Sequence, residues 1–339
     1  MKKIWSFLYI FAALLLLLTP SLGMAVFGES GETANEHLSP PPTLRTREGG
    51  FNPKVLNESA DYLADHFALR QEMVTLWGAL NATLGSSAQE QVILGREGWL
   101  YYAPTLPDYT GQALSDEELE AIARRLSELQ AEAESRGAVF LFTVAPNKNS
   151  LYPEYMPAAY PSRHGEGNLE RLLPWLEAYG VRYVDLFPLK LPYYRTDSHW
   201  TAEGAARAAD ALLAALGRES AYAAAPFSEG APRRGDLYEM LYPAREGAEP
   251  EILYGGALRF THLNDPKDGN AITIRTQGGE TGRLYCWRDS FGIALYPYLA
   301  DAFAEAVFSR STDYALPEGS YDAVILEIAE RNLPNLLGK

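Results

Sequence analysis

The apolar run Val139–Ala145 limits the folds open to this chain more than any other stretch. A strand with one solvated face alternates apolar and polar side chains, whereas a continuous apolar run is typical of a strand buried on both faces. A helical apolar stripe precedes it, opened by Ser115 and Glu118 at the spacing of a capping box and ended by Gly137. A helix leading into a doubly buried strand indicates a sheet covered by helices on both sides.

The alternation of helix and strand patterns continues downstream. Helix-like patterns occur at residues 169–179, 202–216 and 291–303, and strand-like patterns at 181–186, 283–287, 306–309 and 322–328. This order predicts an α/β fold of three layers with a mostly parallel sheet. Residues 218–282 are less regular, with glycine-rich turns and a short strand pattern at 271–276. We expect them to form a small β-rich insertion at the sheet edge.

Residues 1–27 have the composition of a targeting segment. Lys2 and Lys3 precede an uncharged, mostly apolar stretch at residues 5–27, and residues 23–25 offer a cleavage site of small side chains. A stretch of this length could also cross a hydrocarbon core of ~30 Å with the lysines on the cytoplasmic side. We therefore expect a signal peptide or a membrane anchor at 1–27, and export in either case. A polar, proline-containing flexible linker is expected at 28–50, before a domain at 51–339.

The composition narrows the possible partners. A net charge of −15 argues against nucleic-acid binding, because phosphate backbones are bound by basic surfaces. The hydrophobic content of 47% is that of an ordinary globular protein with a core. Cys286 is the only cysteine, so no disulfide can form within the chain, and its apolar surroundings indicate a buried, unreactive thiol.

Two short stretches far apart in the chain carry the chemistry. Residues 195–201 hold Asp197 and His199 two positions apart, and residues 286–292 place Ser290 between a strand pattern and a helix pattern. An imidazole, a carboxylate and a serine are the base, orienting acid and nucleophile of a catalytic triad. Because ligands of open α/β sheets bind beyond the carboxyl ends of the strands, we expect these side chains to meet there. Amides in the first turn of the helix after Ser290 could stabilise an oxyanion.

Each stretch also has a plainer interpretation. Ser290 could be no more than a helix N-cap. Asp197 and His199 could belong to a turn before a helix capped by Thr201, or to a metal site. Zinc needs three or four ligands, and the other histidines, at positions 37, 66, 164 and 262, show no ligand spacing. We therefore predict no metal, and we expect no cofactor.

Further polar residues follow the first and last predicted strands of the sheet. Asn147 and Lys148 come directly after the strand that ends at Ala145, and Arg331 and Asn332 come after the last strand. They are candidates for substrate binding or for stabilising the oxyanion, together with Trp200 and Arg288, which lie in the two stretches described above.

The segments 196–201, with Gly204, and 288–291 resemble the SGNH-hydrolase-like proteins of the alginate O-acetyltransferase type. A related bacterial family is named for its Asp-His-His-Trp signature. Weaker matches at 95–101, 146–148, 235–237 and 327–331 extend the resemblance over residues 60–335. The resemblance implies an SGNH-hydrolase-like fold with Ser290 as nucleophile, His199 as general base and Asp197 as its orienting acid. The acid and base then precede the serine, an order permuted relative to ordinary SGNH esterases.

The chain departs from the family pattern at two positions. Ser198 stands where the signature has its first histidine, and Arg288 stands where a glycine usually precedes Asp-Ser. Asn332 occupies roughly the place of the SGNH asparagine that donates to the oxyanion, although residues 330–332 could equally have a structural role.

The function implied is an extracytoplasmic O-acetyltransferase, either secreted or anchored by its N-terminal segment. It would move an acetyl group through a serine acyl-enzyme onto a cell-surface or exported polysaccharide. The family further implies a membrane-bound O-acyltransferase partner that donates the acetyl group. The alternatives are a carbohydrate acetylesterase with the same triad, a non-catalytic glycan-binding assembly protein, and a structural domain of a membrane complex.

Overall fold

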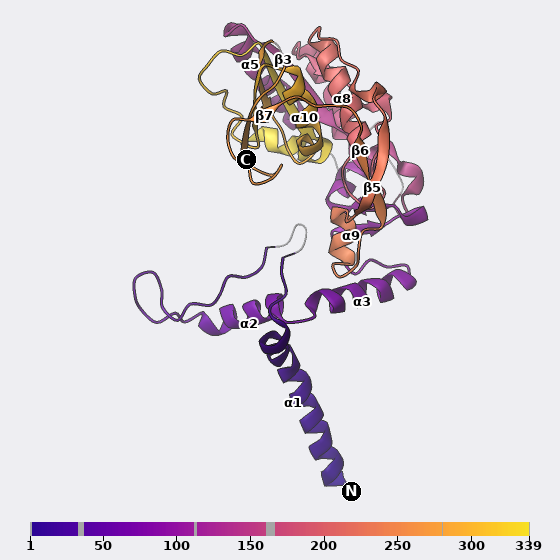
Figure 1. The fold of residues 1–339 in the computed structure, drawn as a ribbon, viewed down its shortest axis with the longest axis vertical. Helices are drawn as coiled ribbons and strands as arrows, with labels where there is room; N and C mark the ends of the chain where they lie inside the picture. Colours follow the sequence, from indigo (N-terminus) through magenta and orange to yellow (C-terminus); the bar gives the residue numbers. More distant parts are fainter. Residues whose placement is uncertain (1, 33–36, 112–113, 161–166, 280, 339) are drawn as a thin grey trace. The chain divides into compact units, whose positions relative to one another are not determined.

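The computed structural model describes residues 2–32, 37–111, 114–160, 167–279 and 281–338, and the chain divides into two compact units. The first, called the helical unit, comprises Met1–Val92 and Asp236–Glu246. The second, called the α/β unit, comprises Ile93–Gly235 and Gly247–Lys339. Both are drawn in Figure 1.

The described residues of the helical unit form helices α1 (Lys2–Phe27), α2 (Val55–His66), α3 (Arg70–Thr83) and α9 (Asp236–Leu241). Helices α2 and α3 are separated by a break at residues 67–69. The break follows from the backbone, because Phe67 is extended and Leu69 adopts a left-handed conformation with φ of 62°. Helix α3 packs on α9, and a Cβ atom on Gly78 would lie 2.3 Å from the carbonyl oxygen of Leu241.

Among the described residues, no helix meets the length and apolarity needed to cross a membrane.

A seven-stranded sheet forms the centre of the α/β unit, in the order β4-β3-β11-β9-β10-β8-β7. Its strands are β3 (Val139–Ala145), β4 (Tyr183–Val184), β7 (Thr261–His262), β8 (Thr273–Gln277), β9 (Arg283–Trp287), β10 (Glu305–Ser309) and β11 (Ala323–Ala329). The five strands from β4 to β10 in this order pair in parallel, while β8 and β7 join one edge antiparallel.

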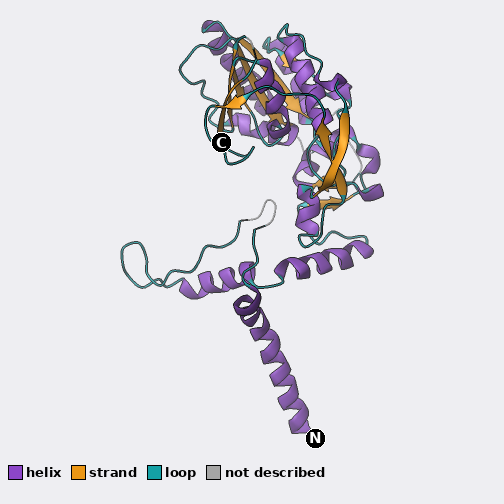
Figure 2. Cartoon of the chain, viewed as in Figure 1, coloured by secondary structure: helices purple, strands orange, loops and turns teal. Residues whose placement is uncertain are grey.

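Helices cover both faces of this sheet, as Figure 2 shows. They are α5 (Asp116–Ser135) and α7 (Asn168–Ala178) on one face, and α8 (Ala202–Ala215) and α10 (Gly292–Ala302) on the other. Strand β3 feeds both cores, because Phe140 and Phe142 pack with α5 and α7 whereas Leu141 packs with α8 and α10. The predicted mostly parallel, three-layer α/β fold is confirmed.

Smaller elements surround the sheet. Strands β1 (Val92–Leu94) and β2 (Leu100–Tyr102) pair with each other. Strands β5 (Phe227–Arg233) and β6 (Glu249–Tyr254) form a second pair, which is antiparallel. The unit also contains the short helices α4 (Leu106–Tyr109) and α6 (Lys148–Leu151). Its 3₁₀ turns are η1 (Arg96–Gly98), η2 (Ala103–Thr105), η3 (Pro153–Tyr155), η4 (Phe187–Leu189), η5 (Tyr222–Ala224) and η6 (Glu330–Leu337). Residues 218–282 thus supply the β5–β6 pair and the antiparallel edge strands.

Candidate active site

Asp197 and His199 lie in a loop that follows β4 and η4 and leads into α8. The loop folds back on itself, because Tyr193 pairs with Trp200 as an antiparallel bridge and the amide of Thr201 donates to the carbonyl of Pro192 at 2.9 Å. Thr201 then caps α8, since its Oγ1 accepts from the amide of Gly204 at 3.2 Å. The predicted cap is confirmed, and it fixes where the loop ends.

Three groups from outside hold this loop in place. The Lys148 ammonium donates to the carbonyls of Tyr194 at 3.1 Å, Arg195 at 3.0 Å and Asp197 at 2.6 Å. Glu249 of β6 accepts from the amides of Arg195 at 2.9 Å and Thr196 at 2.8 Å. Gly235 approaches the loop closely, because a Cβ there would lie 2.4 Å from the carbonyl oxygen of Thr196. The loop backbone is therefore fixed along most of its length.

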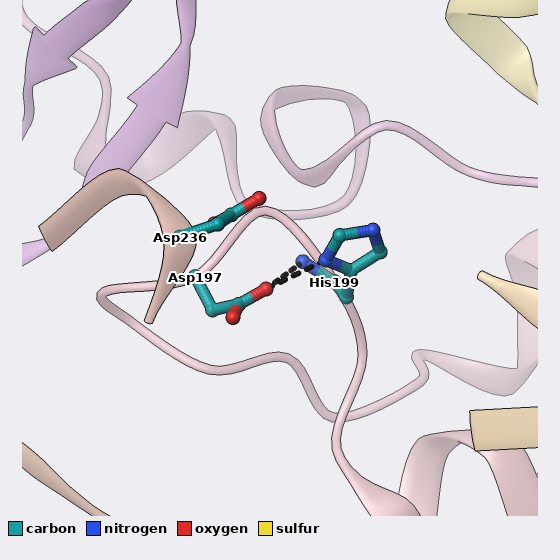
Figure 3. A group of neighbouring side chains, drawn as sticks. All are labelled: Asp197, His199 and Asp236. Carbon is teal, nitrogen blue, oxygen red and sulfur yellow. Dashed lines mark hydrogen bonds and ion pairs between the residues drawn. The ribbon is translucent and has the colours of Figure 1, made fainter. Parts of the chain in front are cut away.

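Asp197 and His199 are joined by two hydrogen bonds to one carboxylate oxygen (Figure 3). Oδ1 of Asp197 accepts from the backbone amide of His199 at 2.9 Å and lies 2.7 Å from its Nδ1. With the proton on Nδ1, this nitrogen donates to Asp197 and leaves Nε2 as an acceptor. Asp236, also drawn in Figure 3, belongs to the helical unit.

Ser290 lies between the end of β9 and the start of α10. Its Oγ is 2.8 Å from Nε2 of His199, so carboxylate, imidazole and hydroxyl form one hydrogen-bonded row. The N-cap position of α10 is occupied by Phe291 and has no side-chain cap, so Ser290 is not serving as the helix cap. This is the arrangement in which an imidazole can take the hydroxyl proton.

The neighbouring Asp289 holds the turn that carries Ser290. Its Oδ1 accepts from the amide of Phe291 at 2.9 Å, and its Oδ2 accepts from the amide of Ala329 at 2.7 Å and from Nδ2 of Asn332 at 2.8 Å. Asp289 thereby ties the serine turn to the end of β11. The amide of Phe291 donates to Asp289 and is therefore not available to an oxyanion, although amides in this first turn were expected to stabilise one.

The charge of Asp197 is balanced by Arg233, for which no functional role was predicted from the sequence. Nη2 of Arg233, at the end of β5, donates to Oδ2 of Asp197 at 2.7 Å. Burial alone would raise the pKa of Asp197, but its hydrogen bond to His199 and the charges of His199 and Arg233 hold that pKa well below its ordinary range. The carboxylate is therefore ionised although only 1% of the residue is exposed.

Four of the other predicted site residues are committed to the protein itself. Lys148 supports the loop of Asp197, and Asn332 donates to Asp289. The Trp200 indole is buried and donates to the carbonyl of Phe291 at 3.1 Å. Arg288, also buried, donates to the carbonyls of residues 269 and 271 at 2.7 and 3.1 Å. These contacts fix the two segments that carry the row.

Asn147 and Arg331 differ from those four. The side-chain amide of Asn147 is buried and has no hydrogen-bond partner among the described residues. The Arg331 guanidinium lies over the rings of Tyr102 and Phe291, at 5.4 and 5.2 Å from their centroids. The Phe291 ring is in turn 4.8 Å from the ring of His199, which places Arg331 beside the row.

The mostly parallel α/β sheet, with Asp197, His199 and Ser290 in one hydrogen-bonded row, is the fold expected from the resemblance to SGNH-hydrolase-like proteins. Residues 92–253 match the family model described as "SGNH hydrolase-like domain, acetyltransferase AlgX". This part of the chain is similar to the domain of that family, and the predicted resemblance is confirmed. The matched part includes Asp197 and His199 and ends before Ser290.

Individual relatives agree with this assignment. A Pseudomonas syringae pv. tomato protein named "Probable alginate O-acetylase AlgJ" is 27% identical over 214 residues, which cover 56% of this chain and 51% of the relative. The chain thus spans about half the length of the curated relatives it matches.

Two solved structures share the fold. Bacillus cereus PatB1 superposes with a TM-score of 0.55 at 16% identity, covering 71% of this chain and 96% of PatB1. A DHHW family protein from Eubacterium siraeum superposes with a TM-score of 0.51 at 16% identity, covering 65% and 88%.

Proposed function

We propose that this protein is a serine-dependent O-acetyltransferase that transfers acetyl groups to a polysaccharide outside the cytoplasm. The observation that carries the proposal is the row from Asp197 through His199 to Ser290, with contacts of 2.7 and 2.8 Å. The family match and relatives named as alginate O-acetylases support acetyl transfer and a polysaccharide acceptor.

The first half of the reaction loads the enzyme. Nε2 of His199 takes the proton of Ser290 as Oγ attacks the carbonyl carbon of an acetyl donor. The tetrahedral intermediate collapses, the bond to the leaving group breaks, and His199 returns the proton to that group. Asp197 keeps the imidazole in the required tautomer and stabilises the imidazolium.

The second half unloads it. A sugar hydroxyl gives its proton to Nε2 of His199 and attacks the acetyl carbonyl, and the proton then returns to Oγ as Ser290 leaves. Water in place of the sugar would make the same site an acetylesterase. We assign the oxyanion to Arg331 or Asn147, since these candidates keep polar groups uncommitted among the described residues.

Export and acetyl supply complete the proposal. The uncharged stretch after Lys2 and Lys3 supports export of the chain. A membrane-bound O-acyltransferase would donate the acetyl groups, as the family resemblance implies.

The test uses the chain from about Gly28 onward, an acetyl ester of a good leaving group, and polysaccharide acceptors that include alginate. Wild type should transfer acetyl to sugar, and Ser290→Ala should lose transfer while keeping its thermal midpoint. Ser135→Ala, at an exposed serine in α5, is the matched control and should behave as wild type. Acetate release without acetylated sugar would indicate the esterase. Undiminished transfer by Ser290→Ala would refute the assignment.

A further inference from the structure

We infer that Arg233 is a positioning residue that orients the Asp197 carboxylate towards His199. We further infer that the β5–β6 pair holds Asp197 and its loop in place. The inference rests on the proposed function, because it assigns a role within that reaction. It concerns the guanidinium of Arg233, which forms an ion pair with the buried carboxylate, Nη2 to Oδ2 at 2.7 Å.

The guanidinium of Arg233 is itself held in place by several groups. Nη1 of Arg233 donates to Oε2 of Glu251 at 2.8 Å, while Nη2 donates to Asp197. The guanidinium lies over the Tyr194 ring at 4.7 Å from its centroid, and the Tyr194 hydroxyl donates to Oε1 of Glu251 at 3.0 Å. Two carboxylates and one ring therefore fix the guanidinium plane.

The ion pair with Arg233 fixes the orientation of the Asp197 carboxylate. Oδ1 takes both contacts with His199, through the backbone amide and Nδ1, so Oδ2 must find its partner elsewhere. A buried carboxylate oxygen without a hydrogen-bond donor costs free energy. Without Arg233, the Asp197 carboxylate could lower that cost by rotating, but it would then lose its hydrogen bond to His199. Because Arg233 holds Oδ2, it keeps Oδ1 directed at Nδ1.

The β5–β6 pair also holds the backbone of the loop that carries Asp197. Glu249 on β6 pairs in register with Arg233 on β5 and accepts from the amides of Arg195 and Thr196. One strand pair therefore fixes both the backbone before Asp197 and its side chain. Residues 218–282 were expected to form only an insertion. Through the β5–β6 pair they have a role in the proposed reaction.

The main experiment measures acetylation of Ser290 in Arg233→Ala. Displacement of a catalytic group by about 1 Å typically costs ~100-fold, so we expect the rate of acetyl-enzyme formation to fall by about that factor. Free guanidinium ion should restore part of the rate in Arg233→Ala and none in His199→Ala. Arg233→Lys should lie between, because one ammonium supplies the charge without the two-point grip. Arg275→Ala, at an exposed arginine of β8, is the matched control and should keep the wild-type rate.

A second measurement does not depend on turnover. The Nδ1 proton of His199, hydrogen-bonded to Asp197, should give a far-downfield proton NMR signal in wild type and in Arg275→Ala. We expect that signal to be lost in Arg233→Ala and restored by guanidinium ion. If wild type forms no acetyl-enzyme, the proposed function fails while this signal still tests Arg233. A signal unchanged in Arg233→Ala overturns the inference, and so does acetylation at the wild-type rate.

Discussion

Replacing Asp289 by alanine should separate the serine turn from the end of β11. The Asp289 carboxylate accepts three hydrogen bonds, from the amides of Phe291 and Ala329 and from Nδ2 of Asn332, at 2.7 to 2.9 Å. Alanine removes the acceptor from all three donors at once. The turn that carries Ser290 then loses the side-chain hydrogen bonds that join it to the end of β11. Both the stability of the fold and the activity should therefore fall.

The size of the effect follows from these contacts. A hydrogen bond to a charged group contributes about 1.5–3 kcal/mol, so three give at least ~4 kcal/mol after allowance for solvent reaching the half-buried Asn332. For a domain of this size each kcal/mol lowers Tm by about 2–4 °C, which predicts a fall of about 10 °C. Thermal melts at pH 7 measure it.

The control for this experiment is Asp313→Ala. Asp313 is exposed and accepts from Oγ of Ser311 at 2.7 Å and from the amide of Ala315 at 3.3 Å, so its loss should cost less than ~1 kcal/mol. If Asp289→Ala melted within about 2 °C of wild type, the reasoning that this carboxylate holds the turn would be refuted.

Two further predictions concern buried groups. Burial first, and then the charge of Asp289, raise the pKa of Glu327 well above its ordinary value of about 4.3, so the folded state binds a proton there that the unfolded chain releases. Stability should fall as pH rises from that value towards the folded pKa, and Glu327→Gln should flatten this fall. Equal slopes of stability against pH in urea melts of wild type and Glu327→Gln would contradict this. Burial also raises the pKa of the Cys286 thiol, so iodoacetamide should label it only in denaturant, and labelling of the native chain would count against the buried position.

Local patterns predicted the elements of the sheet well. The bounds of β3 match the apolar run, and Ser115 and Glu118 form the expected capping box. The position of Ser290 between a strand and a helix could be predicted from the patterns on either side of it, and that of Asp197 and His199 in a loop before a helix from the alanine-rich pattern that follows. What no pattern specified was which side chains would face one another.

The contacts that hold the loop of Asp197 could not be predicted from the sequence for that reason. Arg233 and Glu249 lie in an irregular stretch, and each meets the loop of Asp197 only through long-range folding. Trp200 and Lys148 were candidates to face a substrate, yet both point into the protein and hold backbone carbonyls. Residue type identified these positions, but only the fold gives the direction of each side chain.

The most direct measurement of the central claim is peptide mass spectrometry after incubation with an acetyl ester of a good leaving group. The account predicts one acetyl adduct, on Ser290, that forms in wild type and is absent from His199→Ala. A fluorophosphonate should label the same serine with the same dependence on His199. No adduct on Ser290 from either reagent, in a chain that melts cooperatively, would contradict the acyl-enzyme and favour a glycan-binding role.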